Sequence, residues 1–292
     1  MSTPRIDKRM IVDRLHELGV GSGDVVGLHS SMPSLGKIIL QIHKAGGEAA
    51  VKLAVNEVIE AFLDVLGGQQ GLLVVPTFSF CFAGKPNEEV YEPHTTPSKV
   101  GLLTEVLLRR PDAQRSNQPT HSVAAIGMRA RQLIRDHDQT TPIGVDSPFH
   151  RLARWGGWIC YLGTTSKTLS LLHLAEVLAD VPHADTFCYG YLGWHQAGLR
   201  RTDDGGIETL GLREIPGCSE SFGRFDALLE EAGALRTGRL YRAPLMLFRA
   251  QQALDLAVQK LKAEPFWLLC PAGSCQACDM RRAAHHCRNA PI

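Results

Sequence analysis

One pair of side chains, His173 and Glu176 in the segment HLAE, has the types and spacing that acid–base chemistry requires. Residues three positions apart lie on the same face of an α-helix, so the carboxylate can sit beside the imidazole. A carboxylate in that place fixes the ring tautomer and raises the basicity of the ring, as a general base for an amine or a hydroxyl needs. The alternative is an ordinary pair on a helix surface. Leucines on both sides predict a largely buried helix, which favours the catalytic interpretation because buried polar pairs are costly.

Four short loops at predicted strand boundaries are rich in hydroxyl or histidine side chains. Hydroxyl groups and free backbone N–H groups at such positions suit a ligand that carries amides, carbonyls and phosphates. Each loop alone could be ordinary loop chemistry, but the four together predict a pocket. The loops lie at residues 29–31, 77–79, 121–122 and 164–166.

These loops are connected by an alternation of strands and helices, without a repeat or an interdomain linker. Short apolar runs predict buried strands at 25–28, 71–76, 123–127 and 158–163. Periodicity and capping residues predict helices at 4–18, 49–66, 100–110, 128–137, 167–180, 219–232 and 245–262. The alternation predicts a layered α/β domain with the polar loops gathered at strand ends.

Composition excludes several classes of protein. The 292 residues include 31 Lys and Arg against 30 Asp and Glu, a net charge of +1 that provides no basic stripe for nucleic acid. No apolar run approaches the length of roughly 20 residues that spans a bilayer, and the first residues contain no apolar core of a secretory signal. We therefore expect a cytoplasmic enzyme that acts on small molecules, without nucleic-acid or membrane partners.

The cysteines fall into two groups. Four are predicted to be reduced, buried thiols: Cys81, Cys160, Cys188 and Cys218. The other four crowd a tail, residues 266–292, that follows a predicted domain of residues 1–265; they are Cys270, Cys275, Cys278 and Cys287. Thiolates at these spacings can converge on one zinc ion, but a zinc ribbon has two CxxC pairs and this tail has one. A tail without metal is therefore the preferred interpretation, and structural zinc is the alternative.

Seven segments, in the same order and at similar spacing, resemble the aminoglycoside 3-N-acetyltransferase family, also called the antibiotic N-acetyltransferase family. They are LHSSMPSLG (28–36), VVPTFSF (74–80), PSKVGLLTE (97–105), RSNQPTHSVAAIG (115–127), DSPFHRL (146–152), CYLGTTS (160–166) and SLLHLAEVLADVPH (170–183). The resemblance implies the family's α/β fold, a single domain with a central mixed sheet flanked by helices, distinct from the histone-acetylase type. It also implies direct transfer of acetyl from acetyl-CoA to a small-molecule amine, without a catalytic metal.

The resemblance also implies roles for individual residues. His173 becomes the general base, Glu176 its orienting carboxylate, and His121 lines the junction of donor and acceptor. Arg115 becomes a candidate partner of a CoA phosphate. The residues expected to contact the CoA thioester are Ser30, Ser31, Ser34, Leu35, Gly36, Thr77, Arg115 and Ser122. A cysteine-acyl relay is the rival mechanism, disfavoured because no cysteine shares a loop with a histidine segment.

The acceptor half departs from the family pattern, in which carboxylates suit a polycationic substrate. Arginines mix with carboxylates after the His–Glu helix, so long-range attraction for a polycation is weak. Residues expected to contact the acceptor are Asp185, Tyr189 and Tyr191. Three functions stay open: an aminoglycoside N-acetyltransferase, the same chemistry on another amine or hydroxyl in natural-product metabolism with acetyl-CoA or another acyl-CoA as donor, and a non-catalytic CoA-binding relative. The long apolar helices would allow a homodimer.

Overall fold

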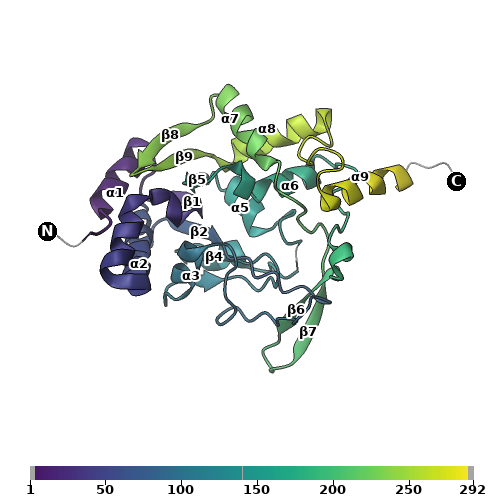
Figure 1. Cartoon of the computed structure of the whole chain (residues 1–292), viewed down its shortest axis with the longest axis horizontal. Helices are drawn as coiled ribbons and strands as arrows, with labels where there is room; N and C mark the ends of the chain where they lie inside the picture. The colour runs from purple at the N-terminus through teal and green to yellow at the C-terminus, as the bar shows by residue number, and fades with distance from the viewer. Residues whose placement is uncertain (1–3, 140, 289–292) are drawn as a thin grey trace.

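A mixed seven-stranded sheet forms the centre of the molecule (Figure 1). The computed structural model describes residues 4–139 and 141–288, and only the backbone of 285–288. The strand order is β3-β4-β2-β1-β5-β9-β8; β1 runs parallel to β2 and β5, and the other neighbours are antiparallel. The strands are β1 Val25–Ser30, β2 Leu72–Pro76, β3 Gln114–Arg115, β4 Val123–Gly127, β5 Trp158–Leu162, β8 Arg236–Leu240 and β9 Ala243–Arg249.

Helices cover both faces of this sheet. Val26 and Leu28 of β1 pack with α1, α2 and α3 on one face, whereas Val25 packs with α4 to α8 on the other. Burial on both faces explains why the central strands read as continuous apolar runs instead of alternating ones. The prediction of an α/β domain with a central mixed sheet is confirmed. The helices are α1 Lys8–Glu17, α2 Lys37–Val65, α3 Leu102–Leu108, α4 Ala130–Ile134, α5 Pro148–Arg154, α6 Leu171–Leu178, α7 Phe225–Glu231, α8 Ala250–Ala263 and α9 Gln276–Arg288.

Two segments differ from the elements that the sequence predicted. The helix expected at 49–66 is the second half of α2, which begins at Lys37 and has non-helical backbone angles at Gly46 and Gly47. The helix expected at 245–262 is strand β9 followed by α8, and β9 pairs with β8 in an antiparallel hairpin. The second prediction was wrong because the short apolar run of β9, with Leu245, Leu247 and Phe248 buried, continues without a break into α8, and such a run cannot be told from a helix segment by periodicity alone.

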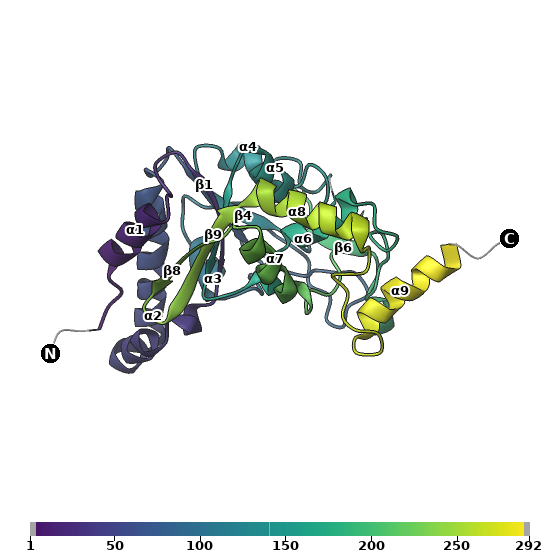
Figure 2. The same cartoon turned by 90° about the horizontal axis from the view of Figure 1, so that it is seen from above.

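The second half of the chain adds a hairpin and a last helix outside the central sheet. A separate two-stranded hairpin, β6 Ala197–Arg201 and β7 Ile207–Gly211, extends from the region after α6. Helix α9 lies at the end of the molecule opposite α1 (Figure 2).

Within the described ranges, no helix combines the length and the apolar character needed to cross a membrane.

Candidate active site

The pair predicted from the sequence, His173 and Glu176, is formed on α6. This short helix lies among apolar side chains and packs against α8. The Nδ1 atom of His173 lies 2.9 Å from Oε2 of Glu176, and both side chains are buried, at 8% and 2% exposure. The i, i+3 spacing therefore produces the contact expected of it, inside the protein and not on a helix surface.

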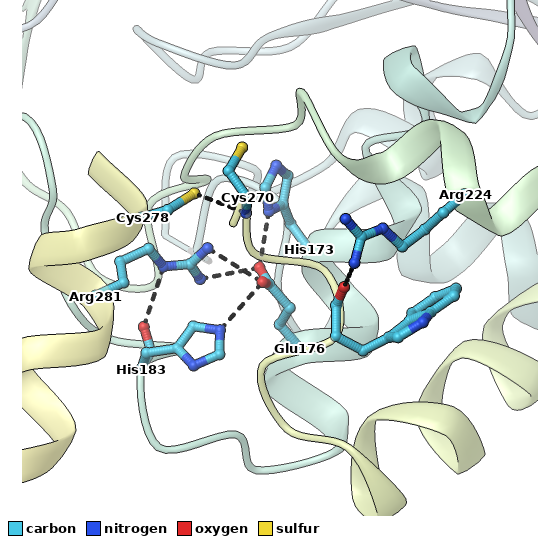
Figure 3. Close-up of polar contacts among 8 residues, drawn as sticks. His173, Glu176, His183, Arg224, Cys270, Cys278 and Arg281 are labelled. Atoms are coloured by element: carbon cyan, nitrogen blue, oxygen red, sulfur yellow. Dashed lines mark hydrogen bonds and ion pairs between the residues drawn. The ribbon is translucent and has the colours of Figure 1, made fainter. Parts of the chain in front are cut away.

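The Glu176 carboxylate is held in a cage of donors (Figure 3). Arg281 of α9 approaches both oxygens, with Nη1 at 3.1 Å from Oε1 and Nη2 at 3.0 Å from Oε2. The Nε2 atom of His183 lies 3.3 Å from Oε1. Burial alone would raise the pKa of Glu176, but Arg281 and the bonds from the two histidines hold that pKa well below its usual range. The carboxylate is thus ionised at neutral pH.

The ionised carboxylate determines the tautomer of the neutral His173 ring. A carboxylate accepts only, so Nδ1 of His173 carries the hydrogen and Nε2 carries the lone pair in the neutral ring. The ring lies against Phe222 and lines a cavity of about 490 Å³, a size typical of small-molecule sites. The arrangement can accept a proton from a group bound in this cavity.

His121 lines the same cavity from the loop before β4. Its Nδ1 atom lies 2.9 Å from Oγ1 of Thr120, and its ring packs edge-on against Phe78 and Phe80. Burial, with the nearby His173, lowers the pKa of His121 well below its usual value, so this ring is neutral near pH 7. A neutral imidazole in that place can position a ligand without adding charge.

The loop after β1 carries the residues expected at the CoA thioester. Ser30 lines the cavity, and a 3-10 turn at Met32–Leu35 follows it. The backbone of Ser31 donates to the carbonyl of Leu162 at the end of β5, so the two loops lie side by side. Gly163 has a positive φ of 70°, and a Cβ there would lie 1.6 Å from Oγ of Ser34. The remaining residues predicted in this loop, outside the cavity lining, are Ser31, Ser34, Leu35 and Gly36.

Thr77, Ser122 and Arg115 form one internal network. The hydroxyl groups of Thr77 and Ser122 lie 3.1 Å apart, and both residues are fully buried. The Nε atom of Arg115 donates to both hydroxyls, and its other nitrogens donate to the carbonyls of Thr77, Pro93 and Thr96. Each guanidinium nitrogen of Arg115 therefore has a protein acceptor in this structure.

The three residues predicted to contact the acceptor do not lie together. Tyr189 and Tyr191 line the cavity, and the ring of Tyr189 packs against Phe82. Asp185 is exposed and lies outside the residues that line the cavity. The part of the cavity wall that these two tyrosines form is therefore aromatic instead of acidic.

Sequence reasoning missed several contributors to the site. Arg281 lies 105 residues after Glu176, in the segment interpreted as a tail, and no local pattern connects the two. Lys167 and Glu220 form an ion pair of 2.6 Å at the cavity lining. Cys218, expected to be an isolated buried thiol, is only partly buried and lies 3.7 Å from the sulfur of Cys270. That part of the prediction was wrong.

Comparisons with known proteins show which family the chain resembles. The family model described as "Aminoglycoside 3-N-acetyltransferase" matches residues 28–262. Aminoglycoside N(3)-acetyltransferase VII of Streptomyces paromomycinus is 32% identical, over 84% of this chain and 87% of its own length. Aminoglycoside N(3)-acetyltransferase IX of Micromonospora chalcea is 30% identical, over 89% of this chain and 94% of its own.

A solved structure extends the similarity almost to both ends of the chain. It is a histidine-to-alanine mutant of aminoglycoside acetyltransferase AAC(3)-IVa in complex with a gentamicin. Its TM-score is 0.79 at 26% identity, and the match covers 97% of this chain and 99% of that one. The ordered segments, the fold and the matched lengths lead to one conclusion: the chain belongs to the aminoglycoside 3-N-acetyltransferase family, a family of acyltransferases.

Proposed function

We propose that the protein transfers an acetyl group from acetyl-CoA to an amine of an aminoglycoside, with His173 as the general base and Glu176 as the carboxylate that orients it. The observation that carries the proposal is the hydrogen bond between these two side chains at the wall of the cavity. Family membership supports the acetyl transfer. The geometry supports the assignment of the base.

The proposed chemistry needs one proton acceptor and no covalent intermediate on the enzyme. A protonated amine is not a nucleophile, so the acceptor enters the step as the neutral amine. Its nitrogen attacks the thioester carbonyl while Nε2 of His173 takes the proton from that nitrogen. Collapse of the tetrahedral intermediate breaks the C–S bond, and the imidazolium returns the proton to the departing CoA sulfur. The products are an acetamide and free CoA, and the ring is neutral again.

The surroundings of His173 fit this cycle. The negative charge of Glu176 stabilises the imidazolium that forms during the step, while the bond to Nδ1 keeps Nε2 directed at the acceptor. Ser30 and the turn after it lie at the carboxyl end of β1, where they would contact the thioester arm of CoA. Positioning of both substrates would supply much of the remaining acceleration. No step of this cycle uses a metal ion.

One observation favours a second acceptor class. Glu220 is the single carboxylate among the described residues that line the cavity, and it is paired with Lys167. Tyr189, Tyr191 and Phe80 supply an aromatic wall instead. Weak electrostatic attraction for a polycation favours a less charged amine or hydroxyl as the alternative acceptor, with the same base.

Measuring release of the CoA thiol from acetyl-CoA tests the proposal, with gentamicin and uncharged primary amines or alcohols as acceptors. Thiol release with gentamicin, together with a monoacetylated product, supports the aminoglycoside. Release only with the other acceptors selects the alternative. CoA binding without release for any acceptor would indicate a non-catalytic relative and contradict the proposal.

The base assignment has its own test. His173→Ala should lower kcat by about 10²- to 10⁴-fold, the range typical of general-base catalysis, and leave the affinity for CoA nearly unchanged. His150→Ala, on α5 outside the cavity lining, is the matched control and should keep wild-type turnover. A His173→Ala enzyme with near wild-type kcat would overturn the assignment.

A further inference from the structure

Four cysteine sulfurs converge beside the cavity, in a group that the proposed reaction does not use. One cysteine belongs to the loop before α7, one follows α8, one immediately precedes α9, and one lies in the first turn of α9. Their Sγ atoms all lie within 4.8 Å of one another. This four-cysteine cluster consists of Cys218, Cys270, Cys275 and Cys278. The side chain of Cys287, the other cysteine of the predicted tail set, lies outside the described residues.

The spacing of the sulfurs fits a single tetrahedral ion. Four thiolates bound to one zinc ion at about 2.3 Å lie about 3.8 Å apart. The sulfurs of Cys218 and Cys270 are 3.7 Å apart, whereas a disulfide requires about 2.05 Å. A compact set of four thiolates is also the donor set that selects zinc among the common divalent metals.

Backbone donors around the cluster support the same interpretation. The N–H of Cys270 donates to the sulfur of Cys278, and the N–H of Glu220 donates to the sulfur of Cys218, both at 3.4 Å. Such outer hydrogen bonds orient thiolate ligands and stabilise their charge at metal sites. Two of the four cysteines, Cys270 and Cys278, are buried, so charged thiolates there need a cation.

We propose that the four-cysteine cluster binds one structural Zn²⁺ ion, each thiol losing its proton to solvent, and that this ion fastens α9 against the catalytic helix. The apolar contacts around the cluster are few, mainly Leu269 and Phe266 with the cysteines themselves. Metal–thiolate bonds would therefore supply much of what holds this segment in place. Four protein ligands close the coordination sphere, which is typical of a structural ion and not of a catalytic one.

The position of the cluster links the ion to the active site (Figure 3). Arg281 follows Cys278 by three residues on α9, and its side chain reaches the Glu176 carboxylate. Cys218 and Cys275 also line the cavity that contains His173. The zinc ion would thus fix the position of Arg281, which neutralises Glu176, and of Cys218 and Cys275, which line the acceptor cavity. This inference does not depend on the acceptor or on acetyl transfer.

Metal analysis of the full-length protein, purified without chelators, is the first test. We expect one equivalent of zinc per chain, and the same value for Cys160→Ala, a control cysteine inside β5 that lies outside the cluster. Cys218→Ser and Cys278→Ser should each lose the zinc. Zinc well below one equivalent in the wild-type protein, before and after incubation with zinc, would overturn the proposal, as would an equivalent of iron.

Three measurements on the wild-type protein test the proposal even if the serine variants do not fold. Titration with p-hydroxymercuribenzoate should release the zinc as thiols are consumed. Cobalt(II) in place of zinc should give the visible absorption of a tetrahedral thiolate site. Thiol titration of the denatured protein in the presence of EDTA should find all eight cysteines reduced; two disulfides in their place would refute the site.

Hydrogen exchange tests the fastening of α9. Removal of zinc should raise exchange in residues 276–284 more than in α1, and added zinc should restore protection. Equal exchange of this segment with and without zinc would show that the ion does not hold α9. None of the measurements in this subsection uses enzyme turnover, so failure of the zinc proposal is distinguishable from failure of the proposed acetyl transfer.

Discussion

Arg281→Met removes the guanidinium that pairs with the buried carboxylate of Glu176. Both side chains are almost completely buried, at 1% and 2% exposure, and two contacts of 3.0 and 3.1 Å join them. Removal of one partner from a buried ion pair typically costs about 3–5 kcal/mol, because the remaining charge has lost its compensation. We expect the free energy of unfolding to fall by that amount at pH 7, measured by urea denaturation.

The loss of unfolding free energy in Arg281→Met should also depend on pH. The folded-state pKa of Glu176 is depressed, so the pairing contributes stability above the unfolded pKa and loses it as pH falls through the folded value. In Arg281→Met the main influence that lowers this pKa is gone, and the carboxyl takes up a proton at a higher pH. The difference in unfolding free energy between wild type and variant should therefore be largest at pH 7 and narrow toward pH 4.

A matched variant separates this effect from simple loss of an arginine. Arg154 pairs with Asp146 at the surface, where both side chains are more than half exposed, so Arg154→Met should cost less than about 1 kcal/mol. A cost of that small size for Arg281→Met, or an equal cost at pH 7 and pH 4, would refute the reasoning.

Three further predictions concern the rest of the fold. Gly163→Ala should lower the free energy of unfolding by about 1–3 kcal/mol in urea, because its Cβ would collide with Ser34. Burial lowers the pKa of His29 and of His137 to about 4, below the unfolded value; urea denaturation should therefore show stability falling by about 1 kcal/mol or more per pH unit from pH 6.5 toward 4. Arg115→Lys should destabilise the protein by about 1–3 kcal/mol but leave the KM for acetyl-CoA within about twofold, since its donors have protein acceptors; a large rise in KM with unchanged stability would indicate a phosphate contact instead.

Much of the fold was predictable because it depends on local patterns. Apolar runs between turn residues located β1, β2, β4 and β5, since each of these strands is buried on both faces. The same criterion failed at β9, where a buried strand continues directly into a helix. A short apolar run that joins a helix without a break shows no separate period, so the pairing with β5 and β8 is what identifies it as a strand.

In the candidate site, too, contacts within one element could be predicted and contacts between distant segments could not. His173 and Glu176 could be paired from the sequence because helix geometry fixes the neighbours of a residue at three positions' distance. Arg115 could not be assigned from its segment alone, because all its acceptors except the Ser122 hydroxyl come from loops 19 to 38 residues away. The family resemblance implied a phosphate contact there, whereas the packing supplies protein acceptors.

The layered α/β class, the family and the local His–Glu pair could be predicted from the sequence, because each depends on residue order or on the period of one element. The surroundings of that pair depend on the tertiary structure. It brings Arg281 to Glu176 across 105 residues and Cys218 to Cys270 across 52. These contacts between distant segments depend on how α9 and the loop before α7 pack against the helices that cover the sheet. No local spacing encodes that packing, so both the cation beside the His–Glu pair and the full four-cysteine cluster appear only in the folded chain.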